Sequence, residues 1–244
     1  MFDFTAPLRQ RFAGLNSGAE FFSLRYVQES HQHLSVRKNV AEPPSLARDQ
    51  GAMLTARVNG VEAYAATADL SQAGLQRALD QAEALARQIA RHALLDLREH
   101  AVASGRADYC SPNLDTLFPA LADCYELLAR ESASVPADAR LVNWQASLGL
   151  STVEQIYLNS AGAELRQAQR FVYPGLDVTA YDGNDSQTRS LGRENFGQQG
   201  SADVISRCGL IGAGPLVADQ ALQLLLAPNT PQGPRDLLLM PDQM

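Results

Sequence analysis

The strongest local constraint on the fold is the dipeptide Asn59-Gly60, which lies between two extended runs at 51–58 and 61–67. Asn-Gly readily takes the positive φ angles of a two-residue type I′ turn, and both runs have the length of a strand. The sequence therefore predicts an antiparallel β-hairpin here.

A long amphipathic helix is predicted directly after this hairpin. Asp69-Leu70-Ser71 offers an N-cap, and apolar residues then recur at helical spacing to about His92. The stripe consists of Leu75, Leu79, Ala82, Leu85, Ala86 and Ile89. Such a helix buries its apolar face when it lies across the hairpins.

A first hairpin is expected before residue 51, after a short helix over 3–15. Two extended runs, at 21–28 and 33–40, flank the polar stretch 29–32, which suits a turn. Pro43-Pro44 then predicts a loop over 41–49, because consecutive prolines cannot donate the hydrogen bonds of a sheet.

The second half of the chain also mixes helices with antiparallel strands. After an irregular stretch, Asn113 or Asp115 can cap a helix whose apolar stripe begins at Leu117. Strands are predicted over 140–148, 151–159, 164–172, 176–182 and 187–196, then a helical turn over 202–208, a helix over 215–226 and an apolar strand over 235–240. The fold class is thus α+β: antiparallel β-hairpins packed against long amphipathic helices, followed by a second antiparallel meander and a C-terminal helix and strand.

The final strand contains Leu237-Leu238-Leu239-Met240, a pattern typical of a strand covered on both faces. Since a compact domain seldom ends on such a strand, we expect a further domain to follow it. We therefore divide the chain into an α+β domain at 1–227 and the start of a truncated second domain at 228–244.

Composition excludes several classes of function. The net charge of −7 and the single lysine, Lys38, argue against a nucleic-acid surface, which needs clustered cations. No run of eighteen apolar residues suggests a membrane span, and the three cysteines include no Cys-x-x-Cys pair. We expect a cytoplasmic protein without a disulfide framework or a zinc ribbon.

The histidines offer weak candidates for chemistry. His31 and His33 would share a strand face and could chelate a metal, but they lie beside the predicted turn with only Glu29 nearby. His92 and His100 lie at or beyond a helix C-terminus, where a structural role is favoured. We assign no metal ligand and no catalytic residue, and the substrate-binding residues are unknown.

Cysteines and glycines give no firmer assignment. Cys124 falls on an apolar helix stripe, where cysteine usually packs as a small hydrophobic residue. Cys110 and Cys208 are the candidate nucleophiles of a third possible function, a cysteine enzyme. The glycines Gly209, Gly212 and Gly214 lack the Gly-Lys-Ser/Thr end of a phosphate-binding loop, so we interpret them as a hinge before the final helix.

Several segments, taken in order, resemble the N-terminal domain of the TldD/PmbA family of metallopeptidases, once described as modulators of DNA gyrase. The hairpin at 51–67 is similar to the family's Gly-x-Gly-x-Arg-Val-x-x-Asp-Gly-x-x-Gly-Phe-Ala-x-Thr, although Ala52 and Ala63 replace glycines. Similar segments are the strand at 19–26, the turn at 156–162 with its Asn-Ser-x-Gly, and the helix and loop at 218–233.

This resemblance implies a zinc metallopeptidase that cleaves unfolded peptides. In TldD-like members, His-Glu-x-x-x-His follows the strand that corresponds to 237–240, and its two histidines bind zinc together with a distant cysteine. The present sequence reaches Met244 before any such motif, so no family site residue is carried onto it, and we expect the chain to be inactive alone. Zinc is the cofactor expected of the full-length family member.

The expected partners follow from the same resemblance. They are an unfolded peptide, held by strand addition to an exposed edge, and a second copy of the chain or a family paralogue in a dimer. The alternative function is a non-catalytic peptide-binding or assembly partner of the PmbA/TldE type.

Overall fold

The computed structural model describes residues 5–192, 197–228, 232–234 and 236–238. The chain divides into two compact units. The first unit comprises Met1–Ser30, Arg48–Cys110 and Thr152–Gln169, and the second comprises His31–Ala47, Ser111–Ser151 and Arg170–Met244. The predicted boundary between residues 227 and 228 is a different division and stays a prediction.

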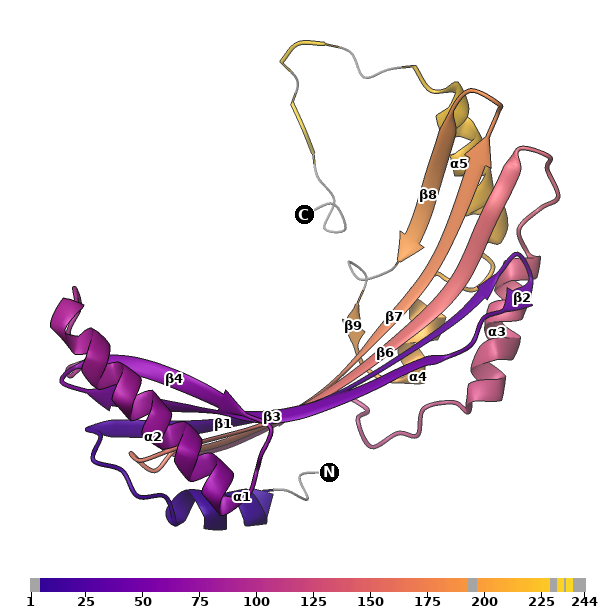
Figure 1. Ribbon diagram of the computed structural model, residues 1–244. Helices are drawn as coiled ribbons and strands as arrows, with labels where there is room; N and C mark the ends of the chain where they lie inside the picture. The colour runs from indigo at the N-terminus through magenta and orange to yellow at the C-terminus, as the bar shows by residue number, and fades with distance from the viewer. Residues whose placement is uncertain (1–4, 193–196, 229–231, 235, 239–244) are drawn as a thin grey trace. The chain divides into compact units, whose positions relative to one another are not determined.

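The described strands form a nine-stranded sheet with the order β4-β3-β1-β6-β7-β5, while β2 pairs with β1 and both β8 and β9 pair with β7 (Figure 1). The strands are β1 (Phe21–Arg37), β2 (Val40–Ala41), β3 (Ser45–Val58), β4 (Val61–Thr67), β5 (Arg106–Cys110), β6 (Leu141–Asn159), β7 (Glu164–Tyr181), β8 (Ser186–Gly192) and β9 (Gln198–Gln199). The α+β class is confirmed, with one parallel pair, β5 with β7.

In the first unit, α1 (Thr5–Ala13) and α2 (Gln72–Ile89) cover one face of the sheet, and α2 packs against β4 (Figure 1). Their apolar residues join Leu24 of β1 and Leu54 of β3 in one core. As predicted, Ser71 caps α2 by accepting a hydrogen bond from the backbone of Gly74 at 3.1 Å. A short 3-10 helix, η1 (Ala90–His92), follows α2.

The hairpin of β3 and β4 is confirmed in detail. Val58 pairs with Val61 across the turn, and Asn59 and Gly60 both have positive φ, 52° and 75°. These are the angles that a type I′ turn requires.

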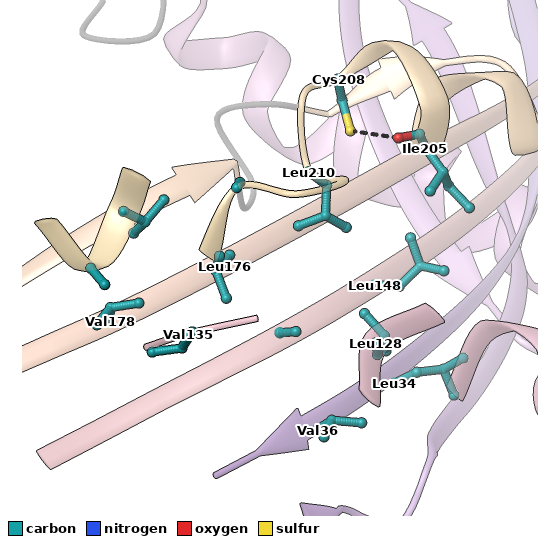
Figure 2. Close-up of a cluster of buried hydrophobic side chains, with 14 of the residues drawn as sticks. Leu34, Val36, Leu128, Val135, Leu148, Leu176, Val178, Ile205, Cys208 and Leu210 are labelled. Atoms are coloured by element: carbon teal, nitrogen blue, oxygen red, sulfur yellow. Dashed lines mark hydrogen bonds between the residues drawn. The ribbon is translucent and has the colours of Figure 1, made fainter. Parts of the chain in front are cut away.

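In the second unit, α3 (Leu121–Ala133), α4 (Ala202–Arg207) and α5 (Gly214–Leu226) contribute to the other large core. Figure 2 shows Leu128 of α3 and Leu210 among side chains from the strands, including Leu148 of β6 and Leu176 of β7. All four are buried. The residues that alternate with these along each strand therefore face away from this core.

The predicted hairpin at 21–40 is wrong in its position, because β1 is continuous through 29–32. No glycine or proline breaks that stretch, and β1 has neighbours on both sides, β3 and β6. The turn instead lies at Lys38-Asn39, which have positive φ of 48° and 65°. The loop at Pro43-Pro44 is also shorter than predicted, since β3 begins at Ser45.

The turn at Lys38 is fixed to the only tryptophan of the chain. The backbone of Lys38 donates to the carbonyl of Trp144 at 3.0 Å, and its ammonium lies 5.9 Å from the centre of the indole ring. The indole Nε1 in turn donates to Oγ of Ser132 at 3.1 Å.

Two other predicted strand breaks are also absent. β6 and β7 each run unbroken through the positions where turns were expected, near Gly149 and near Pro174-Gly175. Gly175 is a paired residue, opposite Gly192 of β8. The predicted strand over 187–196 is β8 as far as Gly192, and 193–196 lie outside the described residues.

Helix α3 begins later than predicted, at Leu121. Pro119 disfavours helical geometry at the residue before it, so neither Asn113 nor Asp115 caps the helix, and Leu117 is 91% exposed. The final helix is confirmed. Of the predicted strand over 235–240, only 236–238 are described; they carry no strand assignment, and Leu237 and Leu238 are exposed.

Candidate functional site

In each unit a groove lies on the face of the sheet that points away from the core of that unit. The histidine groove, in the second unit, has a volume of about 870 Å³. Its walls are polar side chains of β1, β3, β6 and β7, including His31, His33, Gln145, Ser147, Tyr173 and Asp177. The residues that alternate with these along the strands, such as Leu34 and Leu148, point into the core.

His31 and His33 both line the histidine groove and are exposed, in the middle of a strand and not beside a turn. Their shared face matches the two-residue spacing. Within the described part of the chain, no group of three or more histidine, cysteine, aspartate or glutamate side chains could hold a metal ion. The pair therefore lacks the further ligands that a protein zinc site uses.

Glu42 fixes one wall of the histidine groove. Its carboxylate accepts hydrogen bonds from Oγ of Ser35 at 2.5 Å and from Nε2 of Gln145 at 3.2 Å. Its backbone carbonyl accepts from the hydroxyl of Tyr125 at 2.7 Å. The Gln145 amide in the groove is thus held in place by the segment that carries Pro43-Pro44.

The edge groove, in the first unit, has a volume of about 620 Å³ and lies where β4 ends. It is lined by Arg25, Val27 and Glu29 of β1, by the segment from Asp49 to Met53 of β3, and by the segment from Ala66 to Ala68. Most of these side chains are small or apolar. Arg25 points its guanidinium at Gln155, with the shorter contact at 2.8 Å.

The glycine run before α5 is a packed turn and not a phosphate loop. Gly209 and Gly212 have positive φ, and the backbone N–H of Gly212 already donates to Oε2 of the buried Glu131 at 2.7 Å. A Cβ at Gly214 would lie 2.1 Å from Oγ of Ser134, so this position requires glycine. The carboxylate occupies the position where an anion would have to bind.

The cysteines lie apart from both grooves. Cys124 is buried in α3, where burial, and then the charge of Asp123, raises the pKa of its thiol and lowers its reactivity. Cys208 is buried and donates to the carbonyl of Ile205 at 3.3 Å (Figure 2). Cys110 is exposed on β5. His92 and His100 are exposed, in η1 and in the turn that follows Leu97.

Comparison with known proteins identifies part of the chain. Residues 22–86 match the family described as PmbA/TldA metallopeptidase domain 1. This segment is therefore similar to the first domain of that family. The resemblance expected from the sequence motifs is therefore confirmed, and the matched residues run from β1 to α2.

Solved structures show the same fold over almost the whole chain. A proposed modulator of DNA gyrase from Thermotoga maritima matches with a TM-score of 0.64 and 12% identity, over 95% of this chain and 50% of its own. A second proposed gyrase modulator, from Bacteroides thetaiotaomicron, matches with a TM-score of 0.63 and 16% identity, over 92% of this chain and 50% of that protein. TldE from Thermococcus kodakarensis matches with a TM-score of 0.60 and 14% identity, over 90% of this chain and 46% of TldE.

The chain thus spans about half the length of the solved structures it matches. No curated protein matches its sequence. Among the described helices of this chain, none combines the length and the apolar character needed to cross a bilayer.

The sequence did not predict either groove. A signal was present, because β1 and β6 alternate apolar residues with histidine, glutamine and serine over the stretches that line the histidine groove. That alternation indicates one buried and one open sheet face. The edge groove had a weaker signal, since it depends on how far β3 extends before β4 becomes its partner.

Proposed function

We propose that this chain is the peptide-holding, non-catalytic part of a PmbA/TldD-type metallopeptidase that cleaves unfolded peptides. The observation that supports this most directly is the position of the edge groove. Every residue that lines it lies within 22–86, the segment that matches the family. The matched domain therefore contains a groove beside an exposed strand.

Strand addition is the binding mode that this groove favours. An extended peptide brings its own row of N–H and C=O groups, so pairing with a strand edge supplies affinity that does not depend on the peptide's sequence. Shallow pockets for alternate side chains then add modest preferences. Unfolded substrates of many sequences would satisfy this requirement, whereas a folded protein has no free extended segment to offer.

Zinc chemistry in this proposal belongs to residues beyond those described. Hydrolytic zinc needs three protein ligands and an open position for water. His31 and His33 supply two imidazoles with no described third partner. The chain contributes binding and positioning of the peptide, and the complete enzyme contributes the metal site.

The test uses the purified chain and a fluorescent, unstructured peptide of about eight residues, long enough to pair with a strand. We expect the fluorescence anisotropy to rise on binding, zinc by metal analysis to be well below one per chain, and no hydrolysis. A proline-rich peptide of equal length serves as control, because it cannot pair as a strand. Chelator-sensitive cleavage by the purified chain would contradict the proposal.

The second candidate function is a non-catalytic assembly partner, which the fold similarity to TldE favours. The coding sequence downstream of codon 244 separates the two. A His-Glu-x-x-x-His motif there supports the first proposal, and a stop codon supports the second. In both cases we propose a dimer with a second copy or a paralogue, which light scattering of the purified chain tests.

A further inference from the structure

Strand β3 extends beyond its partner at the edge groove. β4 pairs with β3 only from Ala52, opposite Thr67, to Val58. In the first unit, β3 also includes Arg48, Asp49, Gln50 and Gly51, and no described strand pairs with these four on the β4 side. The first three are exposed. A strip of strand edge thus continues in line with β4.

The direction of the backbone groups in this strip follows from the hairpin register. In a two-residue hairpin, the residues that flank the turn, here Val58 and Val61, exchange both hydrogen bonds, and every second residue repeats this arrangement. Even-numbered residues of β3 therefore point their N–H and C=O toward β4. Consistently, the carbonyl of Arg57 points the other way and accepts from Glu20 at 2.9 Å.

Extending this alternation, Arg48 and Gln50 direct their backbone groups to the side where β4 has ended. The N–H of Gln50 is already bound, since it donates to Oδ1 of Asp49 at 2.8 Å. Charged side chains on an edge strand are a known way of protecting it from unwanted pairing. Asp49 protects this edge in that sense.

We propose that the edge strip of β3, Arg48–Gly51, is where an extended peptide pairs, in line with β4, and that Asp49 is a displaceable cap on it. On binding, the Asp49 carboxylate releases the N–H of Gln50 and a peptide carbonyl replaces it. This inference rests on the proposed peptide-binding function and specifies its site. The partner is an extended peptide backbone.

The same register sets a side-chain preference. Asp49 is an odd-numbered residue of β3, so the peptide residue opposite it forms a pair without hydrogen bonds, in which the side chains lie closest together. An opposite charge stabilises such a cross-strand pair and a like charge destabilises it. The peptide therefore prefers a basic residue to an acidic one at this position.

The first experiment compares Asp49→Ala with the wild-type chain by fluorescence anisotropy with the unstructured peptide. Removing the cap frees the Gln50 N–H, and we expect the Kd to fall about 2- to 10-fold, the equivalent of one net hydrogen bond. Asp49→Asn keeps an acceptor and loses the charge, so it should change the Kd less but reduce the preference for basic peptides. Asp80→Ala, an exposed change on α2 with the same charge difference, is the control.

The second experiment leaves the protein unchanged and alters the ligand. Two versions of the peptide have the same side chains; one carries N-methyl groups on alternate amides, which leaves one edge free to pair, and the other carries them on every amide, which leaves neither edge free. Strand pairing needs one free edge, so the first version should keep binding and the second should lose it.

The outcomes separate the two levels of the proposal. If the wild-type chain binds the peptide but Asp49→Ala binds it no more tightly, or both N-methylated versions behave alike, the edge strip is not the site and the wider function stands. If neither chain binds the unmodified peptide, the proposed function fails as well. Tighter binding by Asp49→Ala together with loss for only one N-methylated version supports the inference.

Discussion

The two grooves differ in what their walls offer to a ligand. The histidine groove lies mainly over β1, β6 and β7, strands that have neighbours on both sides, so their backbone groups are already paired and side chains do the recognition. The edge groove offers backbone groups of β3 that no described strand pairs with, beside small or apolar side chains. A surface of side chains discriminates between ligands, whereas a strand edge accepts most extended sequences. This difference is the reason that we propose general peptide binding for the first unit.

The largest effect should come from truncating the two cores separately. Leu54 in the first unit and Leu176 in the second are both fully buried, and replacing either with alanine should cost about 2–5 kcal/mol of unfolding free energy. Urea unfolding followed by Trp144 fluorescence reports on the second unit, and circular dichroism reports on both. We expect Leu176→Ala to shift the fluorescence transition more than Leu54→Ala does. Equal shifts in both signals would show that the grooves share one cooperative unit.

A smaller effect is expected from the buried carboxylates that hold loops in each unit. Glu83 of α2 accepts from Oγ of Ser17 at 2.6 Å and from the backbone of Gly18, and Glu131 of α3 accepts from Gly212. Alanine at either position leaves these donors without their acceptor. The free energy of unfolding, measured in urea, should fall by about 1–3 kcal/mol. The glutamine variants keep an acceptor and should lose less. An equal loss for alanine and glutamine would show that the negative charge is what matters.

Tyr26, close to the edge strip, predicts a weaker, pH-dependent effect. Its hydroxyl contacts Oε1 of Gln50 at 3.2 Å, and burial, with a contribution from Glu154, raises its pKa above the usual 10 while Arg48 lowers it. A raised pKa means that folding favours the protonated form, so this contribution to stability is complete below pH 10 and is lost as the pH rises through the folded-state pKa. Ultraviolet titration should show a late-ionising tyrosine that is absent from Tyr26→Phe. Arg48→Gln should delay its ionisation further.

The smallest effect should follow from removing the histidines of the other groove. If general peptide binding uses the edge groove, the double change His31→Ala and His33→Ala should alter the Kd of the unstructured peptide by less than about 2-fold, well below one hydrogen bond. Zinc content should stay below one per chain. A large loss of peptide affinity would show that the histidine groove, and not the edge groove, binds the peptide.

Local chemistry explains which parts of the fold could be predicted. Asn59-Gly60 and Ser71 determine a turn and a helix start through their own backbone and side-chain preferences, and both are where the sequence places them. The stretch 29–32 looked like a turn because it is polar. It is a strand because β3 and β6 flank it, and its alternate residues Glu29 and His31 line grooves on the open face of the sheet.

Non-local pairing explains most of what was missed. β5 has five exposed residues and no apolar alternation, and only its parallel pairing with β7 makes it a strand. The edge strip could not be predicted because it results from a difference in length between β3 and β4. Pro43-Pro44 gave a partial indication, since β3 starts directly after these residues.

The turn at Lys38 has a practical consequence for studying this chain. Because no other lysine occurs in the sequence, an amine-reactive acceptor dye modifies one side chain besides the N-terminus. That side chain lies next to Trp144, the only tryptophan, so the two form a built-in donor and acceptor pair within the second unit. Energy transfer between them would report opening of the β1–β2 turn without any engineered label site.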